Sequence, residues 1–502
     1  MTQALLISVF LIATCGLVYE LLAGTLASYL LGDTVTQFST VIGAYMFAMG
    51  VGSWISRYIA RGLVMRFVQV EMLVGLLGGF STTLLFIAFG QQWAFRLVLY
   101  TLVSLIGMLV GLEIPLLLRI LKDRFEFRDL VSQILSLDYL GALAASILFP
   151  LVLVPKLGLI RSAFLFGLLN VAVALWGTYI FESSLKSVRF LRVQCAVATI
   201  ILLLGVIFSD RLATFTEQAL YTDDINMPRS SPYQRIVLTR KHGDMRLFLN
   251  GHLQFSSADE YRYHEALVFP GLLSSPSPQR VLVLGGGDGL ALRELLKVPQ
   301  VQQITLVDLD PMMVTLFSSL PLLTALNGNA FHDPRVRVVN ADAFIWLNEN
   351  RDTFDFAVVD FPDPSNFSVG KLYTTAFYRR LTDHLSEHGR FVVQSTSPLF
   401  ARRSYWCIAE TIKATGHTIR PYHAYVPSFG EWGFILAARE PFEIPRTLPP
   451  HLAPQLRFLN DAVLGSLFEF AGDMVPVPAE VNRLNNQILV HYYDEDWHRL
   501  LQ

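Results

Sequence analysis

The sequence predicts three successive parts: an α-helical transmembrane bundle, a small β element, and an α/β doubly wound domain of the Rossmann-like type. Apolar runs long enough to cross a bilayer recur through the first ~210 residues and indicate the bundle. Short strand-like stretches separated by turn signals indicate the β element. Apolar strands that alternate with helices after a glycine-rich turn indicate the α/β domain. We place the three parts at residues 1–210, 211–274 and 275–502, the last with a C-terminal extension.

Composition supports a membrane-embedded first part. Of the 502 residues, 53% are hydrophobic and only 16% are charged, which is too apolar for a purely soluble chain. The first apolar run lacks a charged leading segment, is too long and is followed by further spans, so we do not expect a cleavable signal. The expected helices are seven, at residues 4–30, 38–60, 67–90, 95–118, 133–154, 159–181 and 188–209. These spans predict a multi-pass protein of the cell (inner) membrane, with the lipid bilayer as a partner.

Net charge and cysteine usage argue against several classes of function. The net charge is −2 and no basic patch stands out, so nucleic acid is not an expected partner. Cys15 and Cys195 lie in the expected spans and Cys407 stands alone. Because this spacing fits neither a metal site nor a disulfide framework, we expect neither.

The pattern of the remaining residues predicts a β element followed by an α/β domain. Turn signals such as His242-Gly-Asp separate short strands, and a helix is expected around residues 260–268. The expected strands of the β element lie at 234–240, 245–249 and 252–255. Those of the α/β domain lie near 281–285, 303–308, 335–339, 355–359 and 390–395. Their alternation with helical stretches predicts a mostly parallel sheet.

Acidic residues follow four successive strands of this expected sheet. Ligands of such sheets bind beyond the carboxyl ends of the strands. Folding gains nothing from gathering like charges at one edge, so the pattern indicates a positively charged ligand. The four residues are Asp288, Asp308, Asp342 and Asp360.

Residues 281–289 consist of an apolar strand followed by a glycine-rich turn that contains Asp288. Its glycines, among them Gly285 and Gly287, let the backbone approach a ligand, and Asp308 lies where a carboxylate can bind ribose hydroxyls. Nicotinamide enzymes and S-adenosylmethionine-type enzymes share this fingerprint. Asp288 would repel a pyrophosphate but would pair with the cationic tail of a sulfonium nucleoside. The sequence therefore favours a methyltransferase-type domain over a dinucleotide-binding one.

Several motifs, in the same order, resemble those of the spermidine synthases, the polyamine aminopropyltransferases. The resemblance covers most of residues 230–440, and the helical part, with Tyr19-Glu20 and Asp138-Tyr139, is similar to the membrane-integrated branch of that family. The motifs are Ser231–Gln234, Leu249–Gln254, Asp259–Glu265, Gly285–Gly289, Asp308, Asp342-Ala343, Asp360–Pro364 and Trp432–Phe434.

The resemblance implies a reaction and its ligands. Such enzymes transfer the aminopropyl group of decarboxylated S-adenosylmethionine to an amine, and methylthioadenosine leaves. Putrescine is the default acceptor, with spermidine as the product. The sulfonium nucleoside is a co-substrate, and neither a metal nor a redox cofactor is implied. The resemblance also implies a homodimer, because family members usually associate through their β element.

The resemblance also assigns roles to individual residues. Asp360 matches the family's proton acceptor, which is needed because an alkylammonium has a pKa near 10. The residues matched to the donor, or methylthioadenosine, site are Gln234, Gln254, Gly285, Gly287, Asp308, Asp342 and Ala343. Those matched to the acceptor, or polyamine, site are Tyr263, His264, Asp288 and Asp363.

Departures from the family pattern concern the acceptor. Asn250 stands at an acidic position of a family turn, and Ser365–Gly370 replaces the usual Gly-Pro. The family's Tyr-Pro-Ser-Gly stretch is Val426–Gly430 here, without its tyrosine, although Tyr425 is close by. In the family that tyrosine contacts the acceptor, so cadaverine, spermidine or another amine stays open beside putrescine.

Other interpretations stay open as well. Asp342 or Asp360 could simply cap a turn after its strand, and Asp363 precedes a proline, a common turn arrangement. A polyamine transporter or sensor with a non-catalytic synthase-like domain is the main alternative function. A methyltransferase is the weaker one, because it does not need the pair Asp360 and Asp363 together with Gln254.

Charged residues of the first 210 residues bear on topology and on amine handling. Lys and Arg gather after the second, fourth and sixth spans, at Arg57, Arg61, Arg66, Lys122, Arg124, Arg128, Lys186, Arg189 and Arg192. The positive-inside rule then places the N-terminus in the cytoplasm and, after seven spans, the α/β domain outside. The implied donor is made in the cytosol, however, and for that reason we expect a cytoplasmic α/β domain. Acids within the spans serve either a path for polyamines or helix packing; they are Glu20, Glu71, Glu113 and Asp138.

Overall fold

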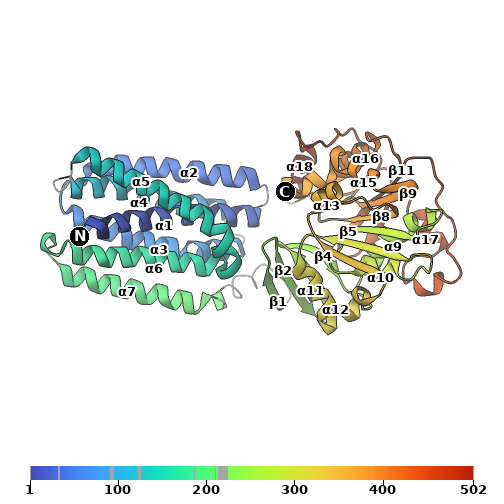
Figure 1. Cartoon of the computed structure of the whole chain (residues 1–502), viewed down its shortest axis with the longest axis horizontal. Helices are drawn as coiled ribbons and strands as arrows, with labels where there is room; N and C mark the ends of the chain where they lie inside the picture. Colours follow the sequence, from blue (N-terminus) through green and yellow to red (C-terminus); the bar gives the residue numbers. More distant parts are fainter. Residues whose placement is uncertain are drawn as a thin grey trace. The chain divides into compact units, whose positions relative to one another are not determined.

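The computed structural model describes residues 2–31, 34–90, 95–122, 126–185, 187–209, 211–212 and 224–500. The chain divides into two compact units, Met1–Ile225 and Asn226–Gln502, each of which is described by itself (Figure 1). The domain boundary expected at residue 210 adjoins residues 213–223, which lie outside the described ranges, as do Arg124 and Lys186.

The first unit is a helical bundle built around its first helix. Within its described residues the α-helices are α1 (Thr2–Leu31), α2 (Thr34–Ile55), α3 (Leu63–Gly90), α4 (Phe95–Leu121), α5 (Phe127–Leu148), α6 (Gly158–Ile180) and α7 (Val188–Ile207). Each of the seven expected spans falls on one of them. Helix α1 packs against α2, α3, α4, α5 and α6, and α7 packs against α3 and α6.

The fifth expected span ends earlier than the sequence indicated. Residues 149–154 do not continue α5 but belong to η2 (Phe149–Leu157), a π-helix that contains Pro150 and Pro155. Proline lacks the amide hydrogen that the α-helical ladder needs, which accounts for the wider winding here. Gly158 follows with φ 74°, a conformation that favours glycine. Hydropathy had not shown this interruption, because every residue of the run except Lys156 is apolar.

The interruption decides how the helices are counted. Six helical segments of the described residues are long and apolar enough to cross a membrane when Phe127–Ile180 counts as one segment of 54 residues. At about 1.5 Å per residue such a segment would be roughly 80 Å long, far more than a ~30 Å hydrocarbon core. With η2 as the connection, α5 and α6 are two separate candidates, and the bundle offers seven.

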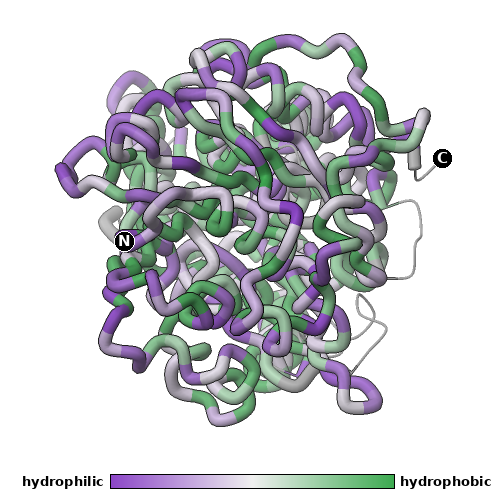
Figure 2. Tube along the Cα trace, turned by 90° about the vertical axis from the view of Figure 1, so that its right-hand side faces the viewer, coloured by the Kyte–Doolittle hydropathy of each residue, from purple (hydrophilic) through white to green (hydrophobic). Residues whose placement is uncertain are grey.

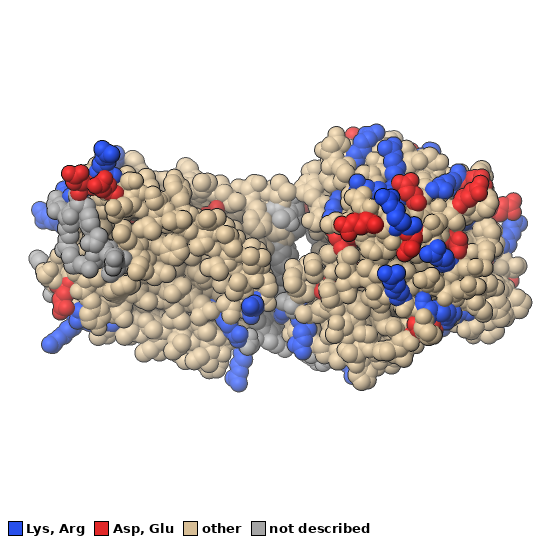
Figure 3. All heavy atoms as spheres, viewed as in Figure 1, with Lys and Arg blue, Asp and Glu red and all other residues tan. Residues whose placement is uncertain are grey.

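The four acids of the expected spans are buried or half-buried in the bundle. Glu20, Glu71 and Glu113 are buried in the bundle, and Asp138 is half-buried. On the face of the bundle shown in Figure 3, Lys, Arg, Asp and Glu gather near the helix ends and leave a broad zone between them almost without charge. This distribution is the one expected of a bundle embedded in lipid.

The second unit begins with a four-stranded sheet in the order β1-β2-β3-β4. Its strands are β1 (Asp224–Ser230), β2 (Arg235–Lys241), β3 (Asp244–Leu249) and β4 (His252–Ser256). The three strands expected from the sequence are β2 to β4, and Asn250, with φ 50°, forms the turn between β3 and β4. Ile236, Leu247 and Phe255 of this sheet pack on helix α11.

A seven-stranded sheet forms the centre of the unit, in the order β10-β11-β9-β8-β5-β6-β7 (Figure 1). The strands are β5 (Arg280–Gly285), β6 (Gln303–Asp308), β7 (Val336–Asn340), β8 (Phe354–Asp360), β9 (Leu385–Gln394), β10 (Thr418–Val426) and β11 (Gly430–Ala438). The α-helices are α9 (Glu260–Ser274), α10 (Leu290–Leu295), α11 (Pro311–Ser319), α12 (Pro321–Leu326), α13 (Ala343–Glu349), α14 (Phe367–Gly370), α15 (Thr375–Asp383), α16 (Arg402–Lys413), α17 (Asp461–Ser466) and α18 (Ile488–Leu500).

Strand alternation gives this sheet two buried faces. Val281 and Val283 pack in a core with α9, α10 and α17, whereas Leu282 and Leu284 pack in a second core with α13, α15 and α16. Hydrophilic and hydrophobic residues alternate along the chain of this unit, as Figure 2 shows. The expected doubly wound arrangement is therefore present.

The sheet is mixed rather than simply parallel at one edge. Strands β5 to β9 are parallel, but β11 pairs antiparallel with β9 and β10 pairs antiparallel with β11. Strands β10 and β11 were not among those expected from the sequence. The tight turn at 427–429 joins β10 to β11, and of these two strands only β11 is buried along most of its length.

Candidate active site

Strand order brings the predicted acids to one edge of the sheet. The parallel neighbours β8, β5, β6 and β7 end side by side, with Gly285 opposite Asp360 and Asp308 opposite Asn340. The four acids therefore follow one another in space as Asp360, Asp288, Asp308 and Asp342, in the order of the strands that precede them. Chain order reverses between β5 and β8, and this switch point is where ligands of doubly wound sheets bind.

The glycines of the β5 turn make room for two of these acids. Gly285 has φ 82°, and a Cβ atom there would lie 2.2 Å from the carbonyl oxygen of Asp360. A Cβ atom at Gly287 would lie 2.6 Å from Oδ2 of Asp308. Packing against these two acids therefore requires glycine at both positions, even without a ligand. Asp288 accepts a hydrogen bond from the Leu290 amide at 2.9 Å, at the start of α10.

Asp308 lies at the end of β6 and is connected to the β element through Asp310. Its Oδ1 accepts the amide hydrogen of Asp310 at 2.8 Å, and burial raises its pKa to about 6. The Asp310 carboxylate in turn accepts hydrogen bonds from Ser231 Oγ (2.6 Å) and Gln234 Nε2 (2.9 Å). Gln234 is therefore brought to the Asp308 corner, as expected of a donor-site residue.

Gln254 and Asp342, two further residues expected at the donor site, both bond to their local surroundings. The Gln254 amide donates to the carbonyl of His252 at 3.2 Å, and within residues 224–500 it makes no hydrogen bond to the acids. Asp342 caps α13 by accepting from the Phe344 and Ile345 amides, and Ala343 is buried at the first helical position. Burial alone would raise the Asp342 pKa, but Lys371, whose Nζ lies 2.6 Å away, brings it below the ordinary value. The capping interpretation of Asp342 is thus correct, whatever further role it has.

Asp360 forms a hydrogen-bonded pair with Tyr263 of α9. The tyrosine hydroxyl donates to Asp360 Oδ1 at 2.6 Å. Burial raises the Asp360 pKa to about 6, while His264 and the tyrosine hydrogen bond act in the opposite direction. A carboxylate with this pKa is ionised near neutral pH and is yet a better proton acceptor than an exposed aspartate.

His264 belongs to a buried charge network next to this pair. Its Nδ1 lies 2.9 Å from Glu260 Oε2, and Arg293 binds both carboxylate oxygens of Glu260, at 2.8 and 2.9 Å. Burial lowers the His264 pKa, but Glu260, Asp288 and Asp360 outweigh it and raise that pKa to about 9. Glu260, held by two cations, has its pKa lowered to about 2 despite its burial. Near neutral pH the histidine is therefore a fixed cation.

Asp363 accepts from three side chains. Gln394 Nε2 donates to its Oδ1 at 3.3 Å, while Thr396 Oγ1 and Tyr493 Oη donate to its Oδ2 at 3.2 and 3.0 Å. Burial raises the Asp363 pKa to about 6, against these hydrogen bonds. Thr396 is fully buried with φ 56°, a strained conformation for a β-branched residue, of the kind that gathers at functional sites.

The loop that lacks the family's tyrosine is apolar where it meets the site. Ser428 is anchored to Asp259 through its amide (2.6 Å) and its hydroxyl (2.9 Å). Phe429 packs edge-on against Tyr263 with ring centroids 6.1 Å apart. Tyr425 is 52% exposed, so it does not take the place of the missing tyrosine.

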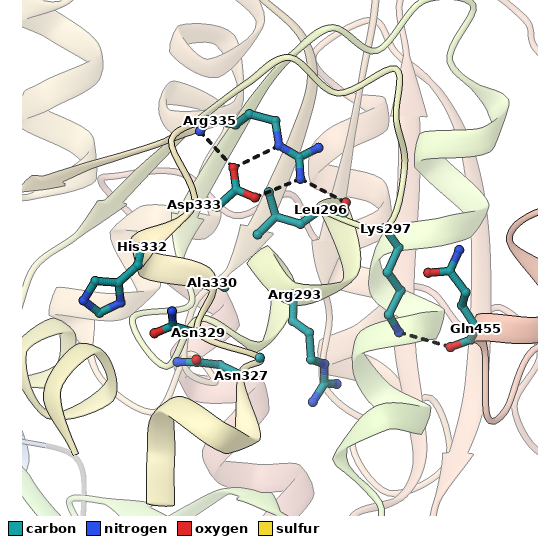
Figure 4. A pocket seen from close by; sticks show the side chains of 11 residues that line it. Arg293, Leu296, Lys297, Asn327, Asn329, Ala330, His332, Asp333, Arg335 and Gln455 are labelled. Carbon is teal, nitrogen blue, oxygen red and sulfur yellow. Dashed lines mark hydrogen bonds and ion pairs between the residues drawn. The ribbon is translucent and has the colours of Figure 1, made fainter. Parts of the chain in front are cut away.

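A surface hollow of about 460 Å³ lies at the end of α10 and next to residues 327–335, and it is separate from the predicted site (Figure 4). It is lined by Arg293, Lys297 and Arg335, and the last is bonded to Asp333. Its lining shares no residue with the predicted site.

Sequence reasoning missed several residues that shape the site. Glu260 and His264 are four residues apart on a helix, so their contact could have been found from that spacing. Gln394, Thr396 and Tyr493 gave no such signal. They reach Asp363 from the end of β9 and from α18, which are distant in sequence.

Fold and site together define a doubly wound α/β protein with an acid-lined candidate site at its switch point. The comparisons with known proteins agree. The family model "Spermine/spermidine synthase domain" matches residues 260–445. The polyamine aminopropyltransferase of Leptospira interrogans is 55% identical over 501 residues, which cover 100% of both chains. The polyamine aminopropyltransferase 2 of Ralstonia nicotianae is 57% identical over 507 residues and 99% of both chains.

Among solved structures, the spermidine synthase of Thermotoga maritima is 25% identical, with a TM-score of 0.44, and the match covers 49% of this chain and 84% of that one. The full-length relatives carry the assignment. This chain belongs to the polyamine aminopropyltransferase family.

Proposed function

We propose that this aminopropyltransferase moves the aminopropyl group of decarboxylated S-adenosylmethionine to putrescine or a related amine, within a membrane-bound chain. The amine nitrogen attacks the carbon beside the sulfonium, the new C–N bond forms as the C–S bond breaks, and methylthioadenosine leaves. One proton must depart from the attacking nitrogen. Sulfonium is a good leaving group, so the protein chiefly positions the amine and accepts this proton.

The observation that carries the proposal is the Asp360–Tyr263 pair at the switch point. Tyr263 occupies Oδ1 of the carboxylate, while Oδ2 faces the glycine turn, where a Cβ atom added to Gly286 would lie 3.3 Å from it. We assign Oδ2 as the atom that takes the proton. The hydrogen bond from Tyr263 keeps the carboxylate in one orientation for this transfer.

The donor is assigned to the β5–β7 side of the edge. Asp308 would bind the ribose hydroxyls, and Asp342 with Ala343 would lie at the adenine. Gln234, held at Asp310, is next to this corner. Gly285 and Gly287 would let the sulfonium nucleoside lie against the backbone of the turn, and Gln254 keeps its assignment from the family motif.

The acceptor is assigned to the β8 side of the edge. Asp288, Asp360 and Asp363 offer carboxylates to the two ammonium groups of a diamine, and Tyr263 supplies an aromatic wall. The fixed cation His264 balances part of this negative charge and would keep the reacting amine from settling at Asp288 alone.

The helical unit is proposed to span the cell membrane seven times, with the α/β unit on the cytoplasmic side, where the donor is made. Support for the spans comes from the zone almost without charge on the face of the bundle in Figure 3, and from the break at η2. The test is a fusion, after the C-terminus, of a reporter enzyme that works only outside the cytoplasm. Activity of this fusion would overturn the cytoplasmic placement.

The purified full-length protein, incubated with decarboxylated S-adenosylmethionine and a panel of amines, tests the proposal. Release of methylthioadenosine with one of the amines is expected, and that amine names the acceptor. Binding of donor and amine without any release would favour the alternative of a polyamine sensor or transporter.

A further inference from the structure

The C-terminal helix α18 contributes a side chain to the acceptor end of the site. Tyr493 donates its hydroxyl hydrogen to Oδ2 of Asp363 at 3.0 Å, across 130 residues of sequence. Its ring also packs near Trp497, with centroids 5.9 Å apart. The predicted site ended well before this helix, and the matched family region ends at residue 445.

Helix α18 is fixed on both sides of Tyr493. On one side the Tyr492 hydroxyl donates to Glu480 at 3.0 Å, and the Arg403 guanidinium lies 3.7 Å from the Tyr492 ring centroid. On the other side Asp496 accepts from the Ser404 amide (3.0 Å) and the Ser404 hydroxyl (2.8 Å). With these anchors, Tyr493 is held at Asp363 rather than merely able to reach it.

The helix also packs on the segment that follows Asp363. A Cβ atom added to Gly370, at the end of α14, would lie 2.5 Å from Val490. His491 packs edge-on against Phe367 with centroids 5.9 Å apart. Thus α18 holds both the Asp363 carboxylate and the short helix α14 beyond it.

The bond matters because it sets how Asp363 can receive a cation. Gln394 occupies Oδ1, and Thr396 shares Oδ2 with Tyr493. These donors favour the ionised form of the carboxylate and fix its plane. A phenol from the Val426–Gly430 loop is absent from the site, since Phe429 has no hydroxyl and Tyr425 is exposed.

We propose that Tyr493 is a positioning residue for acceptor specificity: it orients Asp363 toward the distal ammonium of the amine and closes that end of the site with α18. This inference rests on the proposed function for its substrate class. Its subject is the amine alone, so the donor should be bound as well without Tyr493 as with it.

Tyr493→Phe tests the proposal in the full-length protein in detergent, because it removes the hydroxyl and keeps the ring. The KM for the accepted amine should rise about tenfold, the amount typical for a lost hydrogen bond to a charged group. The KM for the donor and kcat should change little. Loss of one donor raises the pKa of Asp363, so the acidic limb of the amine KM profile should move to higher pH.

Tyr492→Phe is the matched control, because it removes a hydroxyl one residue away that bonds to Glu480 and not to the site, while Asp496 still holds the helix through Ser404. An equal rise in amine KM for both variants, an unchanged KM and pH profile for Tyr493→Phe, or a parallel rise in donor KM would overturn the proposal. Putrescine binding measured by calorimetry on the same variants is independent of turnover. A protein that releases no methylthioadenosine with any amine would refute the proposed function, and the same tenfold comparison would then be made on the putrescine Kd.

Discussion

Asp360→Asn isolates the proton transfer, because an amide keeps the shape of the carboxylate and still accepts the hydrogen bond from Tyr263. With its pKa at about 6, the Asp360 carboxylate of the wild type is roughly 97% ionised at pH 7.5. An amine with a pKa of about 10 is deprotonated in only about one molecule in 300 at that pH. The variant must use this small fraction, so we expect a loss of about 300-fold, within the range of about 10²–10⁴ found when a general base is removed.

The same reasoning predicts rescue by base. The free-amine fraction grows about tenfold per pH unit until it approaches the amine pKa, so roughly 80-fold of the loss should return between pH 7.5 and 9.5. The assay is methylthioadenosine release at saturating donor, with donor affinity measured by calorimetry on the same preparation. Donor affinity should be nearly unchanged, because Asp308 and Asp342 are untouched.

Two results would refute this reasoning. Equal turnover by the wild type and Asp360→Asn at pH 7.5 would remove Asp360 from the mechanism. A large loss of donor affinity would reassign Asp360 to the nucleoside site.

Three further predictions concern binding and the membrane acids. Asp363→Asn should raise the amine KM about tenfold or more while kcat falls little, since the lost charge serves binding rather than proton transfer; a fall in kcat alone would contradict this. Putrescine binding at pH 6 should release protons, because a bound cation lowers the pKa values of Asp360 and Asp363 from about 6. The release should fade by pH 8. Calorimetry in buffers of different ionisation enthalpy measures this release, and proton uptake at pH 6 would contradict the prediction. If Glu113 and Asp138 line a polar path, the double variant Glu113→Gln, Asp138→Asn should change polyamine distribution across the membrane but not turnover in detergent; wild-type handling of polyamines by cells would leave the buried acids a packing role only.

The sequence was sufficient for the features that depend on local pattern. Asp288, Asp308, Asp342 and Asp360 could be placed at one edge because each follows a short apolar strand, and parallel strands of a doubly wound sheet end together. Their order in space required the strand order. Only the parallel pairing of β5 with β8 shows that Asp360 and the glycine turn are neighbours.

Features that depend on tertiary contacts could not be predicted. The π-helical turn at 149–157 lies in a run that is apolar except for Lys156, and hydropathy does not distinguish a span from an apolar turn. The bond between Lys371 and Asp342 joins residues 29 positions apart, and that between Tyr493 and Asp363 joins residues 130 apart. No periodicity or spacing rule connects such pairs, so they became visible only with the fold. The homodimer and the domain boundary at residue 210 stay predictions.

Group transfer itself is tested most directly with a donor that carries an isotopic label in its aminopropyl carbons. We expect the purified full-length protein to move the label onto putrescine or another amine, with one methylthioadenosine released for each labelled product, and Asp360→Asn to abolish most of this transfer at pH 7.5. Labelled donor that is bound and recovered intact in the presence of every amine would contradict the account.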